Sequence, residues 1–247
     1  MKAKAMLERM SLILMLLMSL TVKGYAEEET SDNSAQWNGT VACDLVSHYV
    51  WRGQDLGGVS IQPTLGVEWK GLSLSAWGSY GFDEDDTKEF DLTLGYSAGG
   101  FSVGVTDYWF SYSDPNFTNR YFQYQAHETA HVWEAQVGYD FGFLALNWYT
   151  NFGGADGVKE NGDRAYSSYF NISCPFDWAG LSWTADAGIV PWETSFYAET
   201  DKFSVANVGI GATKTINCAN KYSFGISSNV IWNPTTNYGY FVVGISL

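Results

Sequence analysis

The sequence predicts an all-β protein, a transmembrane antiparallel up-and-down β-barrel of about 12 strands. Three observations predict this fold: apolar and polar residues alternate in many segments, short and long connections alternate between these segments, and aromatic residues are abundant. Aromatic residues make up 17% of the chain and charged residues 16%, with 26 glycines and only 5 prolines. Long strands with aromatic girdles have this balance, whereas disordered chains are poor in aromatic residues.

The clearest alternation runs from Val59 to Phe82 and is interrupted only at Lys70 and Gly71. Because successive side chains of a strand point to opposite faces, a period of two residues indicates β-structure. Each half of the segment is long enough for a tilted strand to cross a bilayer, which takes roughly 9–11 residues. The segment therefore predicts a transmembrane β-hairpin. Pro63 has no N–H to donate, so we expect a bulge or a local loss of strand pairing there.

The same alternation recurs along the chain in further strand segments. The predicted strands are residues 38–51, 59–69, 72–82, 89–97, 101–110, 131–140, 143–152, 164–174, 181–191, 202–215, 221–232 and 238–247. The connections are short at 70–71, 98–100, 141–142, 175–180 and 216–220, and long at 52–58, 83–88, 111–130, 153–163, 192–201 and 233–237. Short turns on one side and long loops on the other are typical of outer-membrane barrels. One alternating strand alone is typical of a soluble sheet, but many together would expose more apolar surface than a soluble monomer tolerates.

The first 26 residues are predicted to be a cleaved signal peptide. A basic start with Lys2, Lys4 and Arg9 precedes an apolar run over 11–22, and small residues at 24–26 suit a cleavage site. Residues 27–36 then form a short polar tail, and residues 37–247 form the barrel. The expected location is the outer membrane of a Gram-negative bacterium.

Charge and cysteine content exclude some classes of function. Without the predicted signal peptide the chain has 9 Lys and Arg against 26 Asp and Glu. This acidic balance argues against nucleic-acid binding and suits a pore that prefers cations. Cys43, Cys174 and Cys218 match no zinc pattern. Free, packed thiols are expected, with a Cys174–Cys218 disulfide as the alternative.

The alternation also predicts which polar side chains face the lumen. The lumen-facing candidates are Asp44, His48, Arg52, Gln62, Glu68, Asp91, Glu134 and Asp186. Carboxylates predominate, and acidic groups in a pore raise the local concentration of cations. In the alternative, these groups hydrogen-bond to one another and fill a closed barrel. Aromatic residues near strand ends, Trp51 among them, are expected in interfacial belts.

The segment His127–His131 has the sequence H-E-x-x-H. This motif binds zinc in metalloproteases when both histidines share one face of a helix. Here the alternation that starts at His131 predicts a strand instead. We therefore expect no metal, no cofactor and no catalytic residue, with His127 and His131 as the alternative for a metal site.

Three segments together resemble the Gcw_chp family. They are Ser47–Gly53, with the sequence S-H-Y-V-W-R-G, then Ile61–Leu65 and Leu74–Ser79; Glu134–Tyr139 is also similar to the family's central strand. The family consists of Gram-negative exported proteins, thought to be outer-membrane barrels, with no established function. The resemblance covers most of residues 40–247 and implies an outer-membrane barrel, with no catalytic residues to transfer.

The expected function is porin-like passive passage of small solutes, with a mild preference for cations. The alternatives are a closed structural or adhesive barrel, a hydrolase at the barrel rim and a soluble secreted β-sandwich. The expected partners are outer-membrane lipid and lipopolysaccharide, the barrel assembly machinery and the solutes themselves. No nucleic acid and no enzymatic activity are expected.

Overall fold

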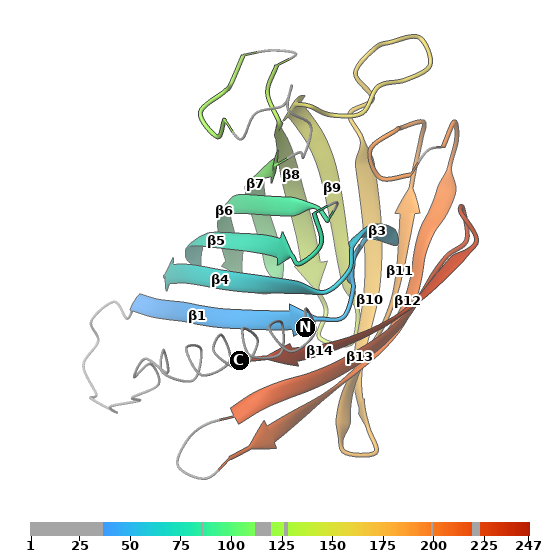
Figure 1. The fold of residues 1–247 in the computed structure, drawn as a ribbon. Coiled ribbons are helices and arrows are strands. Elements are labelled where there is room, and N and C mark those ends of the chain that lie inside the picture. Colours follow the sequence, from blue (N-terminus) through green and yellow to red (C-terminus); the bar gives the residue numbers. More distant parts are fainter. Residues whose placement is uncertain (1–36, 85, 112–119, 126–127, 199, 219–222) are drawn as a thin grey trace, which may run out of the picture. The chain divides into compact units, whose positions relative to one another are not determined.

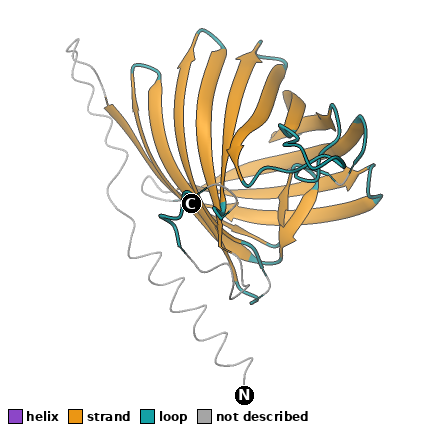
Figure 2. Ribbon diagram, turned by 90° about the horizontal axis from the view of Figure 1, so that it is seen from above, coloured by secondary structure: helices purple, strands orange, loops and turns teal. Residues whose placement is uncertain are grey.

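The computed structural model describes residues 37–84, 86–111, 120–125, 128–198, 200–218 and 223–247, and most of this part of the chain forms a closed antiparallel barrel. The barrel strands are β1 (Trp37–Val46), β4 (Ser60–Trp69), β5 (Leu72–Gly81), β6 (Lys88–Ala98), β7 (Phe101–Ser111), β8 (His131–Asp140), β9 (Ala145–Gly154), β10 (Ser168–Trp178), β11 (Leu181–Val190), β12 (Ser204–Asn217), β13 (Ser223–Asn233) and β14 (Tyr238–Ser246). Figures 1 and 2 show these strands as one twisted, curved wall. The predicted fold class is confirmed.

The predicted signal peptide and the polar tail after it lie outside the described residues. Within the described ranges, no helix is long and apolar enough to cross a membrane.

Between β1 and β4 the chain forms a separate two-stranded sheet, β2 (Tyr49–Trp51) and β3 (Gln54–Gly57). The prediction of one strand over 38–51 followed by a loop over 52–58 is therefore wrong. The barrel strand ends at Val46, and the chain leaves the wall to make a hairpin of its own.

The β2–β3 hairpin has a tight connection that directs it into the barrel. Arg52 and Gly53 make this connection with φ of 51° and 80°. Positive φ at both residues of a two-residue connection is the type I′ arrangement, whose twist matches that of the flanking strands. In Figure 1 the hairpin runs from the end of β1 across the barrel towards β10.

Pro63 causes a local loss of pairing, as the sequence predicts. On either side of it, β4 and β5 pair in the same register, but neither Gln62 nor Pro63 has a partner on β5. On its other side Pro63 still lies opposite Cys43 of β1. The missing N–H of proline is thus accommodated without a bulge.

The connection predicted over 175–180 is shorter in the structure. β10 continues through Pro175, which lies opposite Thr184, to Trp178. Ala179 and Gly180, both with positive φ, then make a two-residue turn.

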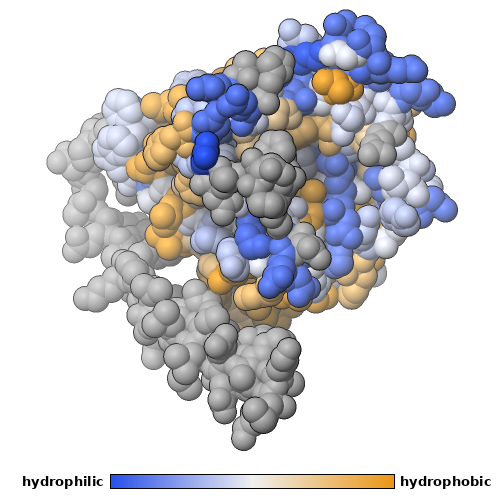
Figure 3. All heavy atoms as spheres, turned by 45° about the horizontal axis from the view of Figure 1, so that its top comes forward, coloured by the Kyte–Doolittle hydropathy of each residue, from blue (hydrophilic) through white to orange (hydrophobic). Residues whose placement is uncertain are grey.

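The two faces of the wall differ in polarity. Val41, Leu65 and Phe241 point outward and expose 72%, 58% and 68% of their surface. Gln62 and Glu134 are polar, and both are buried on the inner side. Figure 3 shows hydrophobic surface on the flanks of the barrel and hydrophilic residues gathered over the loops. Apolar residues outside and polar residues inside are the pattern that a barrel needs in lipid.

The barrel closes over a short seam between β1 and β14. Their register consists of Asp44 with Ser246, Leu45 with Ile245 and Val46 with Gly244. By contrast, β1 pairs with β4 along its whole length. The seam is short because the two strands overlap only at their ends: β1 stops at Val46, where the chain turns into the β2–β3 hairpin, and β14 stops at Ser246, opposite Asp44.

The three cysteines are free thiols. A disulfide between Cys174 and Cys218, the alternative left open by the sequence, is not formed.

Candidate functional site: the lumen around Arg52

The tip of the β2–β3 hairpin is fixed against the far wall of the barrel. The side-chain amide of Asn233 donates a hydrogen bond to the carbonyl oxygen of Gly53 (2.9 Å). A Cβ atom on Gly53 would overlap the carbonyl oxygen of Ala206 in β12. Glycine is therefore required here both for its positive φ and for this close approach.

Two β-bulges in the wall adjoin the hairpin. The β8–β9 register shifts between Trp133 and Glu134, so Phe152 is an extra residue in β9. The β11–β12 register shifts after Gly188, so Ala206 is an extra residue in β12. Bulges redirect neighbouring side chains and are common next to functional sites. Here one bulge lies beside Glu134, and the other contacts the hairpin tip.

Arg52, at the hairpin tip, forms a buried bidentate ion pair with Glu134 in β8. Nη1 donates to Oε2 at 2.5 Å and Nη2 donates to Oε1 at 3.0 Å. The two side chains are only 9% and 1% exposed. Two parallel charge-assisted hydrogen bonds fix both the distance and the orientation of the guanidinium.

Aromatic rings enclose the faces of the same guanidinium. Its Cζ atom lies 3.9 Å from the ring centroid of Tyr149, 4.4 Å from that of Trp51, and 4.9 Å from those of Tyr169 and Tyr197. Ring faces attract a cation, and the attraction is greater where water is excluded. The positive charge is thus held by one carboxylate at its edge and by rings at its faces.

The carboxylate of Glu134 accepts two further hydrogen bonds. The Tyr108 hydroxyl donates to Oε1 at 2.9 Å, and the Tyr197 hydroxyl donates to Oε2. Tyr197 also lies 3.1 Å from Oδ1 of Asn151. Burial raises the pKa of Tyr197, so its hydroxyl stays a neutral donor. Every oxygen of this buried carboxylate is satisfied, which offsets the cost of removing the charge from water.

A second contact fastens the base of the hairpin. The Tyr49 hydroxyl donates to Oε2 of Glu89 in β6 at 2.8 Å, and the Tyr49 ring packs against Trp77. Glu89 and Asp91 are two residues apart on β6 and both are buried. Among the described residues, Oδ1 of Asp91 has no hydrogen-bond partner. The hairpin is thus attached to β6, β8, β12 and β13.

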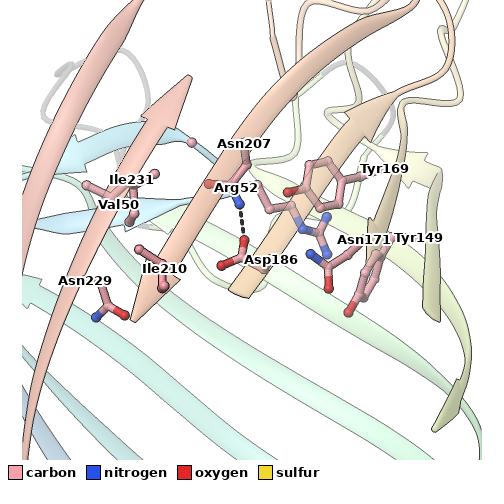
Figure 4. A pocket seen from close by; sticks show the side chains of 11 residues that line it. Val50, Arg52, Tyr149, Tyr169, Asn171, Asp186, Asn207, Ile210, Asn229 and Ile231 are labelled. Carbon is pink, nitrogen blue, oxygen red and sulfur yellow. Dashed lines mark hydrogen bonds between the residues drawn. The ribbon is translucent and has the colours of Figure 1, made fainter. Parts of the chain in front are cut away.

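A cavity of about 240 Å³ adjoins Arg52 (Figure 4). It lies between the hairpin and strands β9 to β13. Its polar lining comprises Arg52, Tyr149, Tyr169, Asn171, Asp186, Asn207 and Asn229. Asn207 donates a hydrogen bond to Asp186, drawn as a dashed line in Figure 4. The cavity therefore offers amide, carboxylate and tyrosine groups inside the barrel.

Two of the residues predicted to face the lumen, Arg52 and Asp186, line this cavity, and a third, Glu134, is paired with Arg52 beside it. Arg52 reaches it from the hairpin and not from a wall strand. Asp91 lies near the base of the hairpin instead, beside Glu89.

The other predicted candidates lie outside this cluster. Asp44 of β1 lies opposite the buried Gln62 of β4 in the strand register. Glu68 is exposed near the turn that follows β4. His48 is in the connection between β1 and β2, with Nε2 3.1 Å from the carboxylate of Asp55.

Several residues of the cluster were not predicted. Trp51, expected in an interfacial belt, instead packs inside the barrel against Tyr108 and Tyr197. Glu89 and Asp91 are two residues apart on one strand and therefore point to the same face, so the alternation also indicated that Glu89 faces the lumen. Tyr197 lies in a loop without periodicity, and no sequence signal pointed to it.

His131 is the first residue of β8, so the strand predicted to start at this histidine is confirmed. Nδ1 is 2.7 Å from Oδ1 of Asp107, and Nε2 is 2.5 Å from the carbonyl oxygen of Tyr121. Both ring nitrogens are thus engaged, and the side chain is fully buried. His127 lies outside the described residues.

No protein-family model and no curated protein matches this chain. The Gcw_chp resemblance therefore has no support from such a match, and the family is unassigned. Among solved structures, the chain is similar to one described as "Unveiling the Mechanism Behind the in-meso Crystallization of Membrane Proteins", with a TM-score of 0.42 and 8% identity over 86% of this chain and 83% of that one. It is also similar to OccK1 (OpdK) of Pseudomonas aeruginosa, with a TM-score of 0.37 and 12% identity over 87% of this chain and 66% of that one. At these scores the similarity carries no information about solute or activity.

Proposed function

We propose that this chain is an outer-membrane channel for passive passage of small solutes, with cations preferred over anions. The observation that carries the proposal is the β2–β3 hairpin fastened inside the barrel by Arg52 and Glu134, with a polar cavity beside it. In this proposal the inward hairpin narrows the lumen, and the cavity beside it supplies groups that a passing solute meets.

The charges of the lumen support the preference for cations. Arg52 brings a positive charge inside, but Glu134 neutralises it in a bidentate pair. Glu89, Asp91 and Asp186 are further acidic side chains on the inner side, and no described lysine or arginine is paired with them. Acidic groups along a pore attract cations and repel anions.

The outer face of the wall supports the membrane location. Its strands present exposed apolar side chains, as on Val41, Leu65 and Phe241, and such an outer face needs the apolar surroundings of a membrane or a detergent. We assign the chain to the outer membrane of a Gram-negative bacterium, reached through a cleaved signal peptide and the barrel assembly machinery. Lipid and lipopolysaccharide are its surroundings, and membership of the Gcw_chp family belongs to the same proposal. No catalytic role is proposed.

A closed structural barrel is the second candidate, and one observation favours it. Tyr169, Val190, Tyr197, Ala198 and Ala206 form a buried cluster. This cluster joins a loop to the wall strands beside the hairpin. If it fills the cross-section of the barrel, no solute passes.

Planar-bilayer recording of the refolded full chain separates the two candidates. We expect single-channel steps and a reversal potential that indicates cation preference. Asp186→Asn should weaken that preference, because it removes a carboxylate that lines the cavity, whereas Asp201→Asn in an exposed loop should leave it unchanged. A correctly folded barrel without steps would contradict the channel and favour the closed barrel.

A further inference from the structure

We infer that the cavity beside Arg52 binds a neutral polyhydroxy solute of monosaccharide size. The inference deepens the proposed function and rests on it in one respect: the solute enters the cavity through the lumen. At ~30 Å³ for each water molecule, a cavity of about 240 Å³ has room for about eight waters, or for one small sugar.

The amide side chains give the cavity both donors and acceptors. The Asn171 amide nitrogen donates to the carbonyl oxygen of Ala187 (3.3 Å), which leaves its side-chain oxygen available as an acceptor. Among the described residues, the side chain of Asn229 makes no hydrogen bond and lines the cavity. A hydroxyl both donates and accepts, so it matches amides better than a purely anionic or cationic group does.

Three glycines on neighbouring strands make room for these polar side chains. A Cβ atom on Gly188 would overlap the ring and hydroxyl of Tyr169, one on Gly209 would contact Asp186, and one on Gly211 would overlap the amide of Asn229. None of the three glycines has a positive φ. Glycine is therefore needed here for space and not for a turn.

The apolar part of the lining suits the C–H faces of a sugar. Val50, Ile210 and Ile231 line the cavity together with the Tyr149 and Tyr169 rings (Figure 4). Ligand pockets typically combine such apolar walls with a few fixed polar groups.

The charges at the cavity argue against anions and zwitterions. The Arg52 guanidinium is already committed, with both terminal nitrogens on Glu134 and rings over its faces. No free positive charge is left for a carboxylate, and Asp186 would repel one. Asp186 instead can accept a hydrogen bond from a solute hydroxyl through the carboxylate oxygen not used by Asn207.

Calorimetric titration of the refolded full chain in detergent with D-glucose tests the inference. We expect glucose to bind and gluconate, its carboxylate counterpart, not to bind. Asn229→Leu keeps the shape of the side chain but removes its amide, and should weaken glucose binding by about tenfold, the value of one lost hydrogen bond. Asn147→Leu is the matched control, since Asn147 lines a different cavity, and it should leave glucose binding unchanged.

A second variant disturbs the Asn229 amide through a residue of the neighbouring strand β12. Gly211→Ala should displace Asn229 and weaken glucose binding, whereas Gly39→Ala, with nothing near its added methyl group, should not. Undetectable glucose binding or equal binding of gluconate would overturn the inference. Channel steps without glucose binding would refute the sugar site alone, and glucose binding without channel steps would refute the channel alone.

Discussion

Arg52 and Glu134 are 82 residues apart in the chain and form a bidentate ion pair inside the barrel. The pair joins the hairpin tip to β8. A buried ion pair contributes to stability only if its remaining hydrogen-bonding groups are satisfied. Tyr108 and Tyr197 provide that here, because both donate to the Glu134 carboxylate.

Replacing Glu134 by Gln should destabilise the barrel strongly. The amide keeps the shape of the side chain but leaves the Arg52 charge buried and uncompensated, a change that typically costs about 3–5 kcal/mol. Denaturant unfolding of the refolded chain in detergent measures it. Asp201→Asn, at the exposed Asp201–Lys202 pair, should change stability little. A Glu134→Gln protein as stable as this control would show that the ion pair does not fasten the hairpin.

Replacing Gly53 by Ala should release the hairpin tip. The added methyl group overlaps the carbonyl oxygen of Ala206, and alanine is strained at a φ of 80°. We expect faster proteolytic cleavage within residues 49–57 in the folded barrel. Gly39→Ala, whose methyl group has open space around it, should be cleaved like the unmodified chain. Equal cleavage of both variants would mean that the tip is not held at Ala206.

The short seam between β1 and β14 can be tested by cross-linking. In a background with Ser at the three native cysteines, Leu45→Cys with Ile245→Cys should form a disulfide, because paired residues of antiparallel strands lie within disulfide range. Non-reducing electrophoresis detects it. Val41→Cys with Ile245→Cys should not cross-link, since Val41 precedes Leu45 by four residues in β1 and therefore lies too far from Ile245. Cross-linking of the second pair and not the first would contradict the register of the seam.

Asp86 should make stability depend on pH in the acid range. The Gly58 backbone N–H, together with that of Asp83, donates to the Asp86 carboxylate and holds the pKa of Asp86 below its usual value. The stabilisation is fully present above the pKa of the unfolded state, about 3.9, and is lost as the pH falls through the lower pKa of the folded state.

Thermal unfolding of the refolded chain from neutral to strongly acidic pH measures this effect. Asp86→Asn cannot titrate, so it should flatten the acid dependence, while Asp201→Asn should retain that of the unmodified chain. An unaltered acid dependence in Asp86→Asn would show that this carboxylate does not link the end of the hairpin to the β5–β6 loop.

The wall of the barrel was predictable from sequence because lipid on one side and lumen on the other impose a period of two residues. The strand predicted over 131–140 is found with those bounds as β8. The hairpin was not predictable in the same way, because the alternation continues from β1 through Trp51. What diverts the chain is a set of distant partners, Glu134 and Tyr197 among them, and alternation carries no information on such contacts. The glycine at position 53 was a local sign that the chain turns there, because Arg52 and Gly53 form the two-residue turn of the hairpin.

Replacing His131 by Ala should leave the zinc content of the protein unchanged, despite the H-E-x-x-H sequence. Both nitrogens of His131 are already engaged, one by Asp107 and one by the carbonyl oxygen of Tyr121. His131 is the first residue of a strand and residues 128–130 before it are not helical, so this part of the motif lacks the helical turn that the zinc site needs. Metal analysis of the purified chain with and without this substitution checks the point, with Asp107→Asn as a control for loss of local packing. Stoichiometric zinc that disappears in His131→Ala but persists in Asp107→Asn would establish the metal site instead.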